Sequence, residues 1–318
     1  MLTQKLMRLW PAPAPSPNDL SLNEIFNHDT YRRASSERQA EIRRGSSQFR
    51  YDEEKQRLFW NTYFPTGSYI GSLVGCEVLD FGCFTGGRGV FWAQEFKIAK
   101  IYGCDINPLY IQAANEFAEL QGVRHDYRLI EDGTIPFPDE IFDTVASFDV
   151  LEHVDDVKRC MKEIYRVLKP GGKAYLVFPQ FYQPLESHLG FVTYMPALQW
   201  FIPAKTLTKA FVREIESDQD SYWYKPHPTE EWEKLPYLNG VTQRSFKKIL
   251  ADMPFEVEWQ SRTSILSHGN SFQTLRRFVV RPLLALMLTT RLFDEILLDR
   301  IAVILQKPGG GRLTIQSS

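Results

Sequence analysis

The sequence lacks the long apolar runs and the charge excess that indicate membrane-spanning or nucleic-acid-binding proteins. No window holds the roughly 20 uncharged apolar residues that a membrane span needs, and no apolar run of signal-peptide length follows Lys5 and Arg8. The formal net charge is -2, from 37 basic and 39 acidic residues, which does not favour a phosphate backbone as partner. We therefore expect a cytoplasmic protein, at most peripheral at a membrane, with no nucleic acid as its substrate.

Cysteine is also scarce. The chain has 4 cysteines, with no C-x-x-C pair and no spacing typical of a zinc site. Cys76, Cys83 and Cys104 lie in or beside predicted strands, where a free thiol packs as a small apolar side chain. A reducing compartment is the expected setting for such thiols.

The composition suits a folded core, with 43% hydrophobic and 24% charged residues. Short apolar strands alternate with amphipathic helices, which predicts an α/β fold: a doubly wound parallel sheet with helices on both faces. The predicted strands are Glu77–Phe81, Lys100–Asp105, Tyr127–Glu131, Phe142–Phe148, Lys173–Pro179, Phe255–Trp259 and Arg300–Gln306. The predicted helices between them are Gly87–Glu95, Pro108–Gln121, Asp156–Leu168 and Thr242–Met253.

The same pattern divides the chain into segments. The proline-rich run at 11–17 predicts an extended tether, and the aromatic and proline-rich run after Pro179 predicts an insertion over the sheet. We expect a flexible tether at 1–20, a helical lead-in at 21–74, the core at 75–179, a substrate lid at 180–241, a return to the core sheet at 242–308 with an apolar helical insertion at about 262–299, and a flexible tail at 309–318.

A glycine-rich turn follows the first predicted strand. The strand ends around Asp80, and Gly82, Gly86 and Gly87 precede a predicted helix. Glycine allows a tight turn and lets the backbone approach a ligand closely, while the N-terminus of the helix offers unpaired N–H groups. This context predicts a nucleotide-type ligand at the turn.

A second acid lies at the end of the next strand, where Asp105 closes the run Ile-Tyr-Gly-Cys-Asp. A carboxylate at this position, about 25 residues after the first, can accept hydrogen bonds from both hydroxyls of a ribose. The ordinary alternative is a solvated aspartate at a strand end. The neighbouring glycine-rich turn favours the ribose interpretation.

Five motifs in order resemble the class I S-adenosylmethionine-dependent methyltransferases, in the small-molecule branch that includes quinone-biosynthesis methyltransferases. They are Leu-Asp-Phe-Gly-Cys-Phe-Thr-Gly at 79–86, Gly-Cys-Asp-Ile at 103–106, Ile-Pro-Phe-Pro-Asp-Glu-Ile-Phe-Asp at 135–143, Asp-Val-Leu-Glu-His-Val at 149–154 and Arg-Val-Leu-Lys-Pro-Gly-Gly at 166–172. The turn lacks the G-x-G-x-x-G spacing that a dehydrogenase needs for a pyrophosphate. The resemblance implies S-adenosyl-L-methionine as the cofactor and a Rossmann-like seven-stranded sheet whose last strand is antiparallel.

The resemblance also implies positions for the cofactor. The amino-acid end would be held by Asp80, Gly82 and Gly86, and the ribose by Asp105, with Cys83, Phe84 and Ile106 also in contact with the cofactor. The adenine amine would be approached by Glu131 and Asp132, which end the third strand, and the backbone around Ser147 and Phe148 would line the methyl site. One position departs from the family, which usually has glycine where this chain has Phe84. We expect this side chain to narrow the turn.

The candidates for chemistry follow the fourth strand. His153, with Asp149 beside it, would remove a proton from an acceptor hydroxyl. In the quinone methyltransferases that this segment resembles, residues here bind a divalent cation, and Asp149, Glu152 and His153 fall on those positions. The alternative is structural, with the Glu152–His153 pair bonding to neighbouring backbone. Many relatives with this motif need no metal, so we expect none.

The predicted lid carries further candidates. His188 would be a second base or an ordinary surface histidine, and Phe181, Tyr182 and Tyr194 would line a largely apolar acceptor pocket. The apolar segment 276–299 contains several arginines. It could lie at a membrane interface, but packing on the lid or against a second subunit of a homodimer is the favoured interpretation.

The sequence therefore predicts a methyltransferase that acts on an oxygen or carbon of a small acceptor, hydrophobic or linked to a lipid or glycan. Two alternatives remain. One is a methyltransferase of protein or RNA, and the other is a non-catalytic module that kept the fold, for which Phe84 is the best support.

Overall fold

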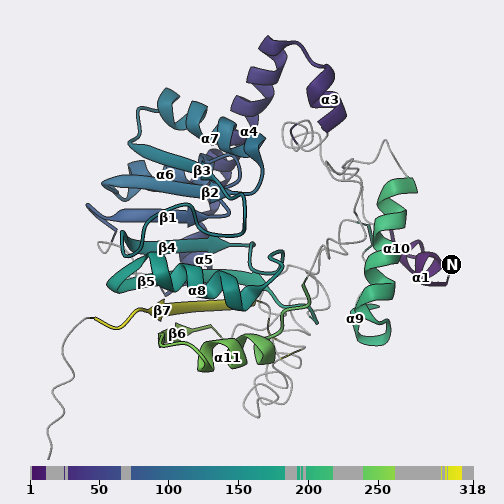
Figure 1. Ribbon diagram of the computed structural model, residues 1–318. Helices are drawn as coiled ribbons and strands as arrows, with labels where there is room; N and C mark the ends of the chain where they lie inside the picture. The colour runs from purple at the N-terminus through teal and green to yellow at the C-terminus, as the bar shows by residue number, and fades with distance from the viewer. Residues whose placement is uncertain are drawn as a thin grey trace, which may run out of the picture.

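The computed structural model describes residues 2–11, 25, 28–65, 73–182, 192–193, 195, 198–217, 239–261, 295, 298 and 300–309. Its centre is one seven-stranded sheet with the order β3-β2-β1-β4-β5-β7-β6 (Figure 1). The strands are β1 (Glu77–Phe81), β2 (Lys100–Asp105), β3 (His125–Leu129), β4 (Phe142–Phe148), β5 (Leu168–Pro179), β6 (Glu256–Gln260) and β7 (Arg300–Gln306).

The strand directions confirm the predicted fold class. Strand β1 pairs in parallel with β2 and β4, β2 with β3, and β4 with β5. Strand β7 runs antiparallel between β5 and β6. The chain order reverses between β1 and β4, and in open α/β sheets the crevice at such a switch point, outside the carboxyl ends of the strands, is where ligands bind.

Helices cover both faces of the sheet because alternate side chains of each strand point to opposite sides. In β5, Tyr175 and Val177 pack on one face, while Ala174, Leu176 and Phe178 pack on the other. The first face carries α5 (Phe59–Tyr63), α6 (Gly87–Glu95) and α7 (Pro108–Leu120), and the second carries α8 (Val157–Val167) and α11 (Gln243–Ala251) (Figure 1).

The predicted helical lead-in, residues 21–74, contains one long helix. After the short α3 (His28–Arg33), a single helix α4 runs from Ser36 to Arg57, and the Ser35 side chain caps its first turn. This helix is polar along most of its length, and tertiary contacts hold it. Arg43 pairs with Glu116 of α7, and the buried Glu54 accepts a hydrogen bond of 2.9 Å from the Trp92 indole of α6.

A small helical unit lies beside the sheet domain (Figure 1). It contains α1 (Leu2–Met7), α9 (Leu198–Phe201) and α10 (Ala204–Ser217). The sequence predicted a flexible tether for 1–20, whereas residues 2–7 are helical because Met7 is buried against Leu207 and Phe211 of α10. Of the segment 262–299, the structure describes only Glu295 and Leu298, so the predicted apolar helix lies outside the described residues.

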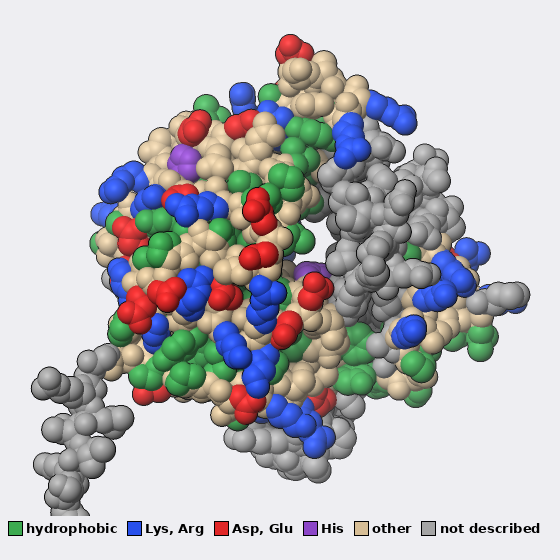
Figure 2. All heavy atoms as spheres, in the orientation of Figure 1, with side chains coloured by type: hydrophobic (Ala, Val, Ile, Leu, Met, Phe, Trp, Pro, Cys, Tyr) green, Lys and Arg blue, Asp and Glu red, His purple; other side chains and the backbone are tan. Residues whose placement is uncertain are grey.

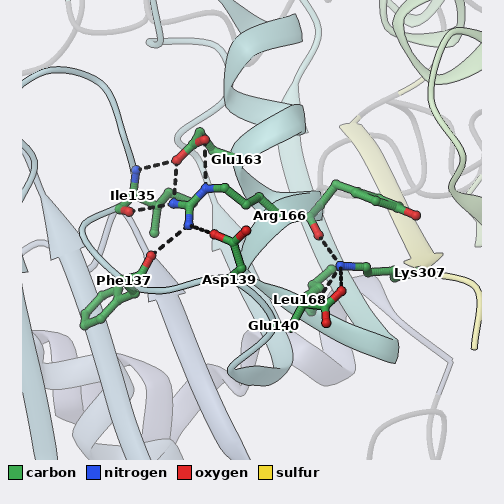
Figure 3. A network of polar contacts seen from close by, with 9 residues as sticks. Ile135, Phe137, Asp139, Glu140, Glu163, Arg166, Leu168 and Lys307 are labelled. Carbon is green, nitrogen blue, oxygen red and sulfur yellow. Dashed lines mark hydrogen bonds and ion pairs between the residues drawn. The ribbon is translucent and has the colours of Figure 1, made fainter. Parts of the chain in front are cut away.

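The motif at 135–143 is anchored to α8 by Arg166 (Figure 3). The guanidinium group donates to the carbonyl oxygens of Ile135 and Phe137, each at 2.9 Å, and pairs with Glu163 and Asp139. Five donors in a planar fork make arginine suited to this role. These contacts fix the loop that leads into β4.

Candidate functional site

The first polar side chain at the switch point is Asp80, in the last part of β1. Only 1% of its surface is exposed, and neither carboxyl oxygen has a hydrogen-bond partner among the residues that the structure describes. Burial raises the pKa of Asp80 to about 7, against the lowering effect of Arg88. A buried acid without hydrogen bonds is costly, so this carboxyl group fits a ligand that brings N–H donors or a positive charge.

The turn after β1 is tight because two of its glycines have the left-handed conformation. Gly82 has a φ of 77°, and a Cβ there would lie 2.2 Å from the Val150 side chain. Gly86 has a φ of 74° and precedes α6, where a Cβ would lie 2.7 Å from Ala114. The backbone N–H of Gly82 and that of Cys83 both donate to the carbonyl of Cys104, which holds the turn against β2.

Phe84 also has the left-handed conformation, with a φ of 50°. This is where glycine usually stands in the family that the motifs resemble, and the backbone explains that preference. The Phe84 ring packs against Tyr110, with 4.4 Å between ring centroids, and the Arg50 guanidinium lies 5.2 Å from its centre. The ring therefore packs between α4 and α7, in the cluster that these helices form beside the turn.

Asp105 ends β2 and faces the same turn. One carboxyl oxygen accepts from the Phe84 N–H and the other from the Asn107 N–H, each at 3.1 Å. Burial raises the pKa of Asp105, while these backbone hydrogen bonds lower it. The next residue, Ile106, is 75% exposed although it is a large apolar side chain. The structure thus brings an acid from each of two adjacent strands to the glycine-rich turn, with an exposed apolar side chain beside them.

The remaining residues predicted to contact the cofactor differ in whether their side chains are exposed to a ligand. Strand β3 ends at Leu129, so Glu131 and Asp132 lie in the loop that follows and not at the strand end as predicted. Both are exposed, and Asp132 accepts from the Thr134 N–H at 2.9 Å. The Phe148 ring is buried among aromatic rings, including Trp60, at 5.6 Å between centroids. Its side chain serves the core, which leaves its backbone for any ligand contact.

Asp149 has a defined partner that the sequence did not indicate. It follows β4 with a φ of 59°, and its N–H donates to the Val177 carbonyl. Its carboxylate forms an ion pair with Arg300, the first residue of β7. Because β7 is antiparallel, its start lies at the same edge of the sheet as the ends of β4 and β5. The paired aspartate is therefore a weaker candidate for a base than an unpaired one.

Glu152 and His153 have contrasting surroundings. Glu152 is 2% exposed, and neither of its carboxyl oxygens has a hydrogen-bond partner among the described residues. Burial, together with the Asp149 carboxylate, raises the pKa of Glu152 well above its usual range. The His153 side chain is 37% exposed, with Nε2 3.7 Å from Glu152 Oε1. Of the predicted catalytic residues that the structure describes, Asp149 and His153 are exposed to a similar extent, at 39% and 37% of their side chains, and the Asp149 carboxylate is paired with Arg300.

Asn239 fixes the loop that carries these residues, and sequence analysis missed it. Its side-chain amide donates to the carbonyls of Leu151 and Val154, at 2.7 and 2.8 Å, and its N–H donates to the Glu152 carbonyl. The spacing of 88 residues from Leu151 left no local signal. An Asn-Gly pair such as 239–240 is typical of a turn and does not indicate contacts with a distant loop.

The lid candidates are described in part. Phe181 and Tyr182 contact each other, with 5.3 Å between ring centroids, and Tyr182 is 40% exposed. His188 and Tyr194 lie outside the described residues. In the described part of the chain, no three His, Cys, Asp or Glu side chains converge in a way that could hold a metal ion.

These features together define a class of protein. A doubly wound sheet with an antiparallel last strand, a glycine-rich turn after β1 and acids at the ends of β1 and β2 form a binding site for a nucleoside-type ligand. The Asp80 carboxyl group, which has no hydrogen-bond partner among the described residues, is suited to a cationic or N–H-bearing end of such a ligand.

Comparison with known proteins identifies the class more closely. Residues 79–176 match the family model described as a methyltransferase domain. The chain is 36% identical over 108 residues to sterol 24-C-methyltransferase of Aspergillus fumigatus, covering 32% of this chain and 28% of that protein. It is 29% identical over 173 residues to a ubiquinone/menaquinone biosynthesis C-methyltransferase of Neisseria meningitidis, covering 52% and 66%.

Erythromycin 3''-O-methyltransferase of Saccharopolyspora erythraea is 36% identical over 100 residues, covering 31% of this chain and 33% of that protein. This chain thus spans less than two thirds of the length of each of these relatives. A solved geranyl diphosphate methyltransferase has the same fold, with a TM-score of 0.51 and 15% identity over 96% of this chain and all of that one.

Residues 79–176 of the chain therefore form a class I S-adenosylmethionine-dependent methyltransferase domain. The cofactor of this domain is S-adenosyl-L-methionine. The site fits it, since the carboxyl oxygens of the buried Asp80 have no hydrogen-bond partner among the described residues and a Cβ at Gly82 would lie 2.2 Å from the Val150 side chain.

Proposed function

We propose that this protein transfers a methyl group from S-adenosyl-L-methionine to an oxygen or carbon of a small, hydrophobic acceptor, including acceptors linked to a lipid or glycan. The observation that carries the proposal is the pair of acids, Asp80 and Asp105, at adjacent strand ends around a turn in which Gly82 and Gly86 leave no room for a Cβ. The relatives whose names specify sterol, quinone and macrolide methylation support the acceptor class.

Each residue of the turn has a proposed role in holding the cofactor. The Asp80 carboxylate would accept from the ammonium of its amino-acid end, beside the backbone of Gly82, Cys83, Phe84 and Gly86. Asp105 would accept from the ribose hydroxyls through lone pairs left over from its backbone hydrogen bonds. Ile106 would cover one face of the adenine ring, with Glu131 and Asp132 near its exocyclic amine.

The bound cofactor supplies an electrophilic methyl group on a sulfonium, and the protein has to align the acceptor and exclude water. His153 would take the proton from an acceptor hydroxyl, since its side chain is 37% exposed and follows the end of β4. Phe181 and Tyr182 would contact the apolar part of the acceptor. The proposed roles of His188 and Tyr194 stay predictions.

Three further predictions concern the setting of the protein. Its free thiols favour a cytoplasmic location. Among the described residues no helix is long and apolar enough to cross a membrane. A homodimer, and a peripheral membrane contact through 276–299, are predictions that concern residues largely outside the described part of the chain.

Calorimetric titration with S-adenosyl-L-methionine tests the proposal first. We expect binding by the unaltered chain and at least about tenfold weaker binding by Asp105→Ala, since a hydrogen bond to a charged group contributes about 1.5–3 kcal/mol. Unchanged affinity in that variant would refute the ribose assignment. No binding by the unaltered chain would refute both this proposal and a macromolecular methyltransferase, and would support a non-catalytic module.

Mass spectrometry then tests the acceptor class. The chain and its cofactor are incubated with a prenylated hydroquinone, a sterol and a glycosylated macrolide, and each product is examined for the mass of one added methylene. His153→Ala should slow turnover of a hydroxyl acceptor and leave cofactor affinity unchanged. Full activity in this variant would remove His153 from the mechanism.

A further inference from the structure

The unit formed by α1, α9 and α10 has a core of its own. Met7 packs with Leu198, Leu207 and Phe211, all buried. Polar contacts connect the same elements, because Gln4 and Arg8 both donate to the Glu214 carboxylate, at 2.9 and 2.8 Å. The inner faces of these helices therefore pack against one another.

The outer surface of this unit is unusually apolar. Phe201 is 83% exposed and Leu9 is 70% exposed, and the other large apolar side chains exposed here are Leu2, Trp10 and Trp200. Single exposed apolar residues are ordinary on protein surfaces, but a concentration of them indicates an interaction site. Elsewhere among the described residues, the exposed large apolar side chains are spread over separate elements, as Val74, Leu120 and Val257 show.

Basic residues outnumber acidic ones in the same unit, with Lys5, Arg8, Lys205, Lys209 and Arg213 against Glu214 and Glu216. Lys205, Lys209 and Arg213 are exposed and follow one another at four-residue spacing, so they form a stripe along one side of α10. Lys5 of α1 and Arg8, the residue that follows α1, add to them. The one acid of the unit whose side chain is described, Glu214, is 10% exposed and paired with Arg8. In the space-filling view, basic and hydrophobic side chains lie together over α1 and α10 (Figure 2).

We propose that the α1–α9–α10 unit docks on the surface of an anionic lipid bilayer. Its aromatic and leucine side chains would enter the headgroup region, and the basic stripe would contact the negative headgroups. Aromatic side chains with flanking lysine and arginine are the combination that suits a membrane interface. The rest of the chain supplies the balancing negative charge, since the whole sequence has a net charge of -2. The proposal is independent of methyl transfer and of the acceptor.

Co-sedimentation with vesicles tests the proposal in the absence of cofactor and acceptor. The full chain is mixed with phosphatidylcholine vesicles that contain either no charged lipid or about 30% phosphatidylglycerol. We expect at least about tenfold stronger partitioning onto the anionic vesicles, decreasing as the salt concentration rises. The triple variants Leu9→Ser/Trp10→Ser/Phe201→Ser and Lys205→Gln/Lys209→Gln/Arg213→Gln should each lose about tenfold or more of this binding.

Matched variants on the sheet domain control for general loss of apolar surface or charge. Val74→Ser/Leu120→Ser/Val257→Ser and Lys162→Gln/Lys247→Gln/Lys248→Gln alter exposed residues of the same kinds, and both should bind vesicles as the unaltered chain does. The proposal is overturned if the full chain stays in the supernatant with both vesicles, or if the controls lose as much binding as the test variants. Sedimentation velocity provides a second check. If the unaltered chain forms a dimer that the Leu9/Trp10/Phe201 variant abolishes, the surface is an interface between two copies of the chain, and the proposal of bilayer docking is overturned.

Discussion

Two residues of the glycine-rich turn have unusual local environments. Asp80 is buried next to Arg88, with Glu54 and Asp105 also acting on its charge, and its carboxyl oxygens have no hydrogen-bond partner among the described residues. Phe84 holds a backbone conformation that glycine adopts more easily. Both features lie where the cofactor is proposed to bind, so each can be tested by binding or stability.

Burial raises the pKa of Asp80 to about 7, so the proposed contact with the cofactor should make binding depend on pH. An ammonium group beside the carboxylate lowers its pKa, so the bound form holds fewer protons, and affinity should rise as the pH increases through 7. Calorimetry at pH 7 in two buffers of different ionisation enthalpy should show release of about half a proton per site.

Asp80→Asn controls for protons exchanged elsewhere. The asparagine keeps the shape of the side chain but cannot ionise, so this variant should bind more weakly and release about half a proton less than the unaltered chain. Equal proton release by the two proteins would show that Asp80 is not the group that ionises on binding.

Substitutions at Phe84 separate the contribution of its ring from that of its backbone. Phe84→Ala and Phe84→Gly both lose the contact with Tyr110, but only glycine adopts a φ of 50° without steric cost. In urea unfolding, the glycine variant should be more stable than the alanine variant by about 1 kcal/mol. Equal stability would indicate that the turn leaves the left-handed conformation once the ring is removed.

At the scale of elements, α4 packs directly against the glycine-rich turn and the start of α6. The Ser47 hydroxyl donates to the Thr85 carbonyl at 2.8 Å, and a Cβ on Gly87 would lie 1.9 Å from the Ser47 carbonyl oxygen. The backbone of α4 and the start of α6 are therefore in direct contact. A polar helix is ordered here by this packing, since its own sequence provides little apolar surface.

Gly87→Ala should separate α4 from α6, because backbone atoms cannot rotate away as a side chain can. We expect a loss of more than about 2 kcal/mol in the free energy of unfolding, measured in urea, and a weaker affinity for the cofactor. Gly309→Ala, where a Cβ meets nothing within 4 Å, should change stability by less than about 0.5 kcal/mol. A Gly87→Ala protein as stable as the Gly309→Ala control would contradict this close contact.

At the scale of the molecule, Lys307, which follows β7, connects the C-terminal part of the sheet to the methyltransferase core (Figure 3). Its ammonium is nearly buried, and it donates to the carbonyls of Tyr165 and Leu168 at 3.1 and 2.8 Å and pairs with Glu140. Strand β7 immediately precedes it and forms the antiparallel pair with β5. The C-terminal part of the sheet is therefore fixed to α8 and to the loop before β4.

Lys307→Met should destabilise the protein by about 2–3 kcal/mol, because two buried carbonyls and a carboxylate lose their donor. Glu140→Gln should cost about 0.5 kcal/mol or less, since the Glu140 side chain is 53% exposed and its ion pair faces solvent. Chemical unfolding of both variants provides the comparison. Equal losses would mean that the ion pair, and not the carbonyl contacts, provides the stability.

Local pattern was sufficient for much of the sheet domain. The predicted bounds of β1, β2, β4, β7 and α6 agree with the structure, because alternation along buried strands and a glycine before a helix are properties of neighbouring residues. Strand β5 begins at Leu168, earlier than predicted, since pairing with β4 extends it through the Lys-Pro-Gly-Gly run. That extension depends on a partner strand and left no signal in its own segment.

The sequence by itself determined the α/β class, the glycine-rich turn, the two acids at strand ends and, through ordered motifs, the methyl donor. All of these depend on short-range spacing. Only the tertiary structure showed that Asp149 pairs with Arg300 and that Asn239 bonds to the loop that carries His153. It also showed that α1 packs against α10. Such contacts join residues far apart in the chain, so they follow from strand register and helix packing, which no local pattern encodes.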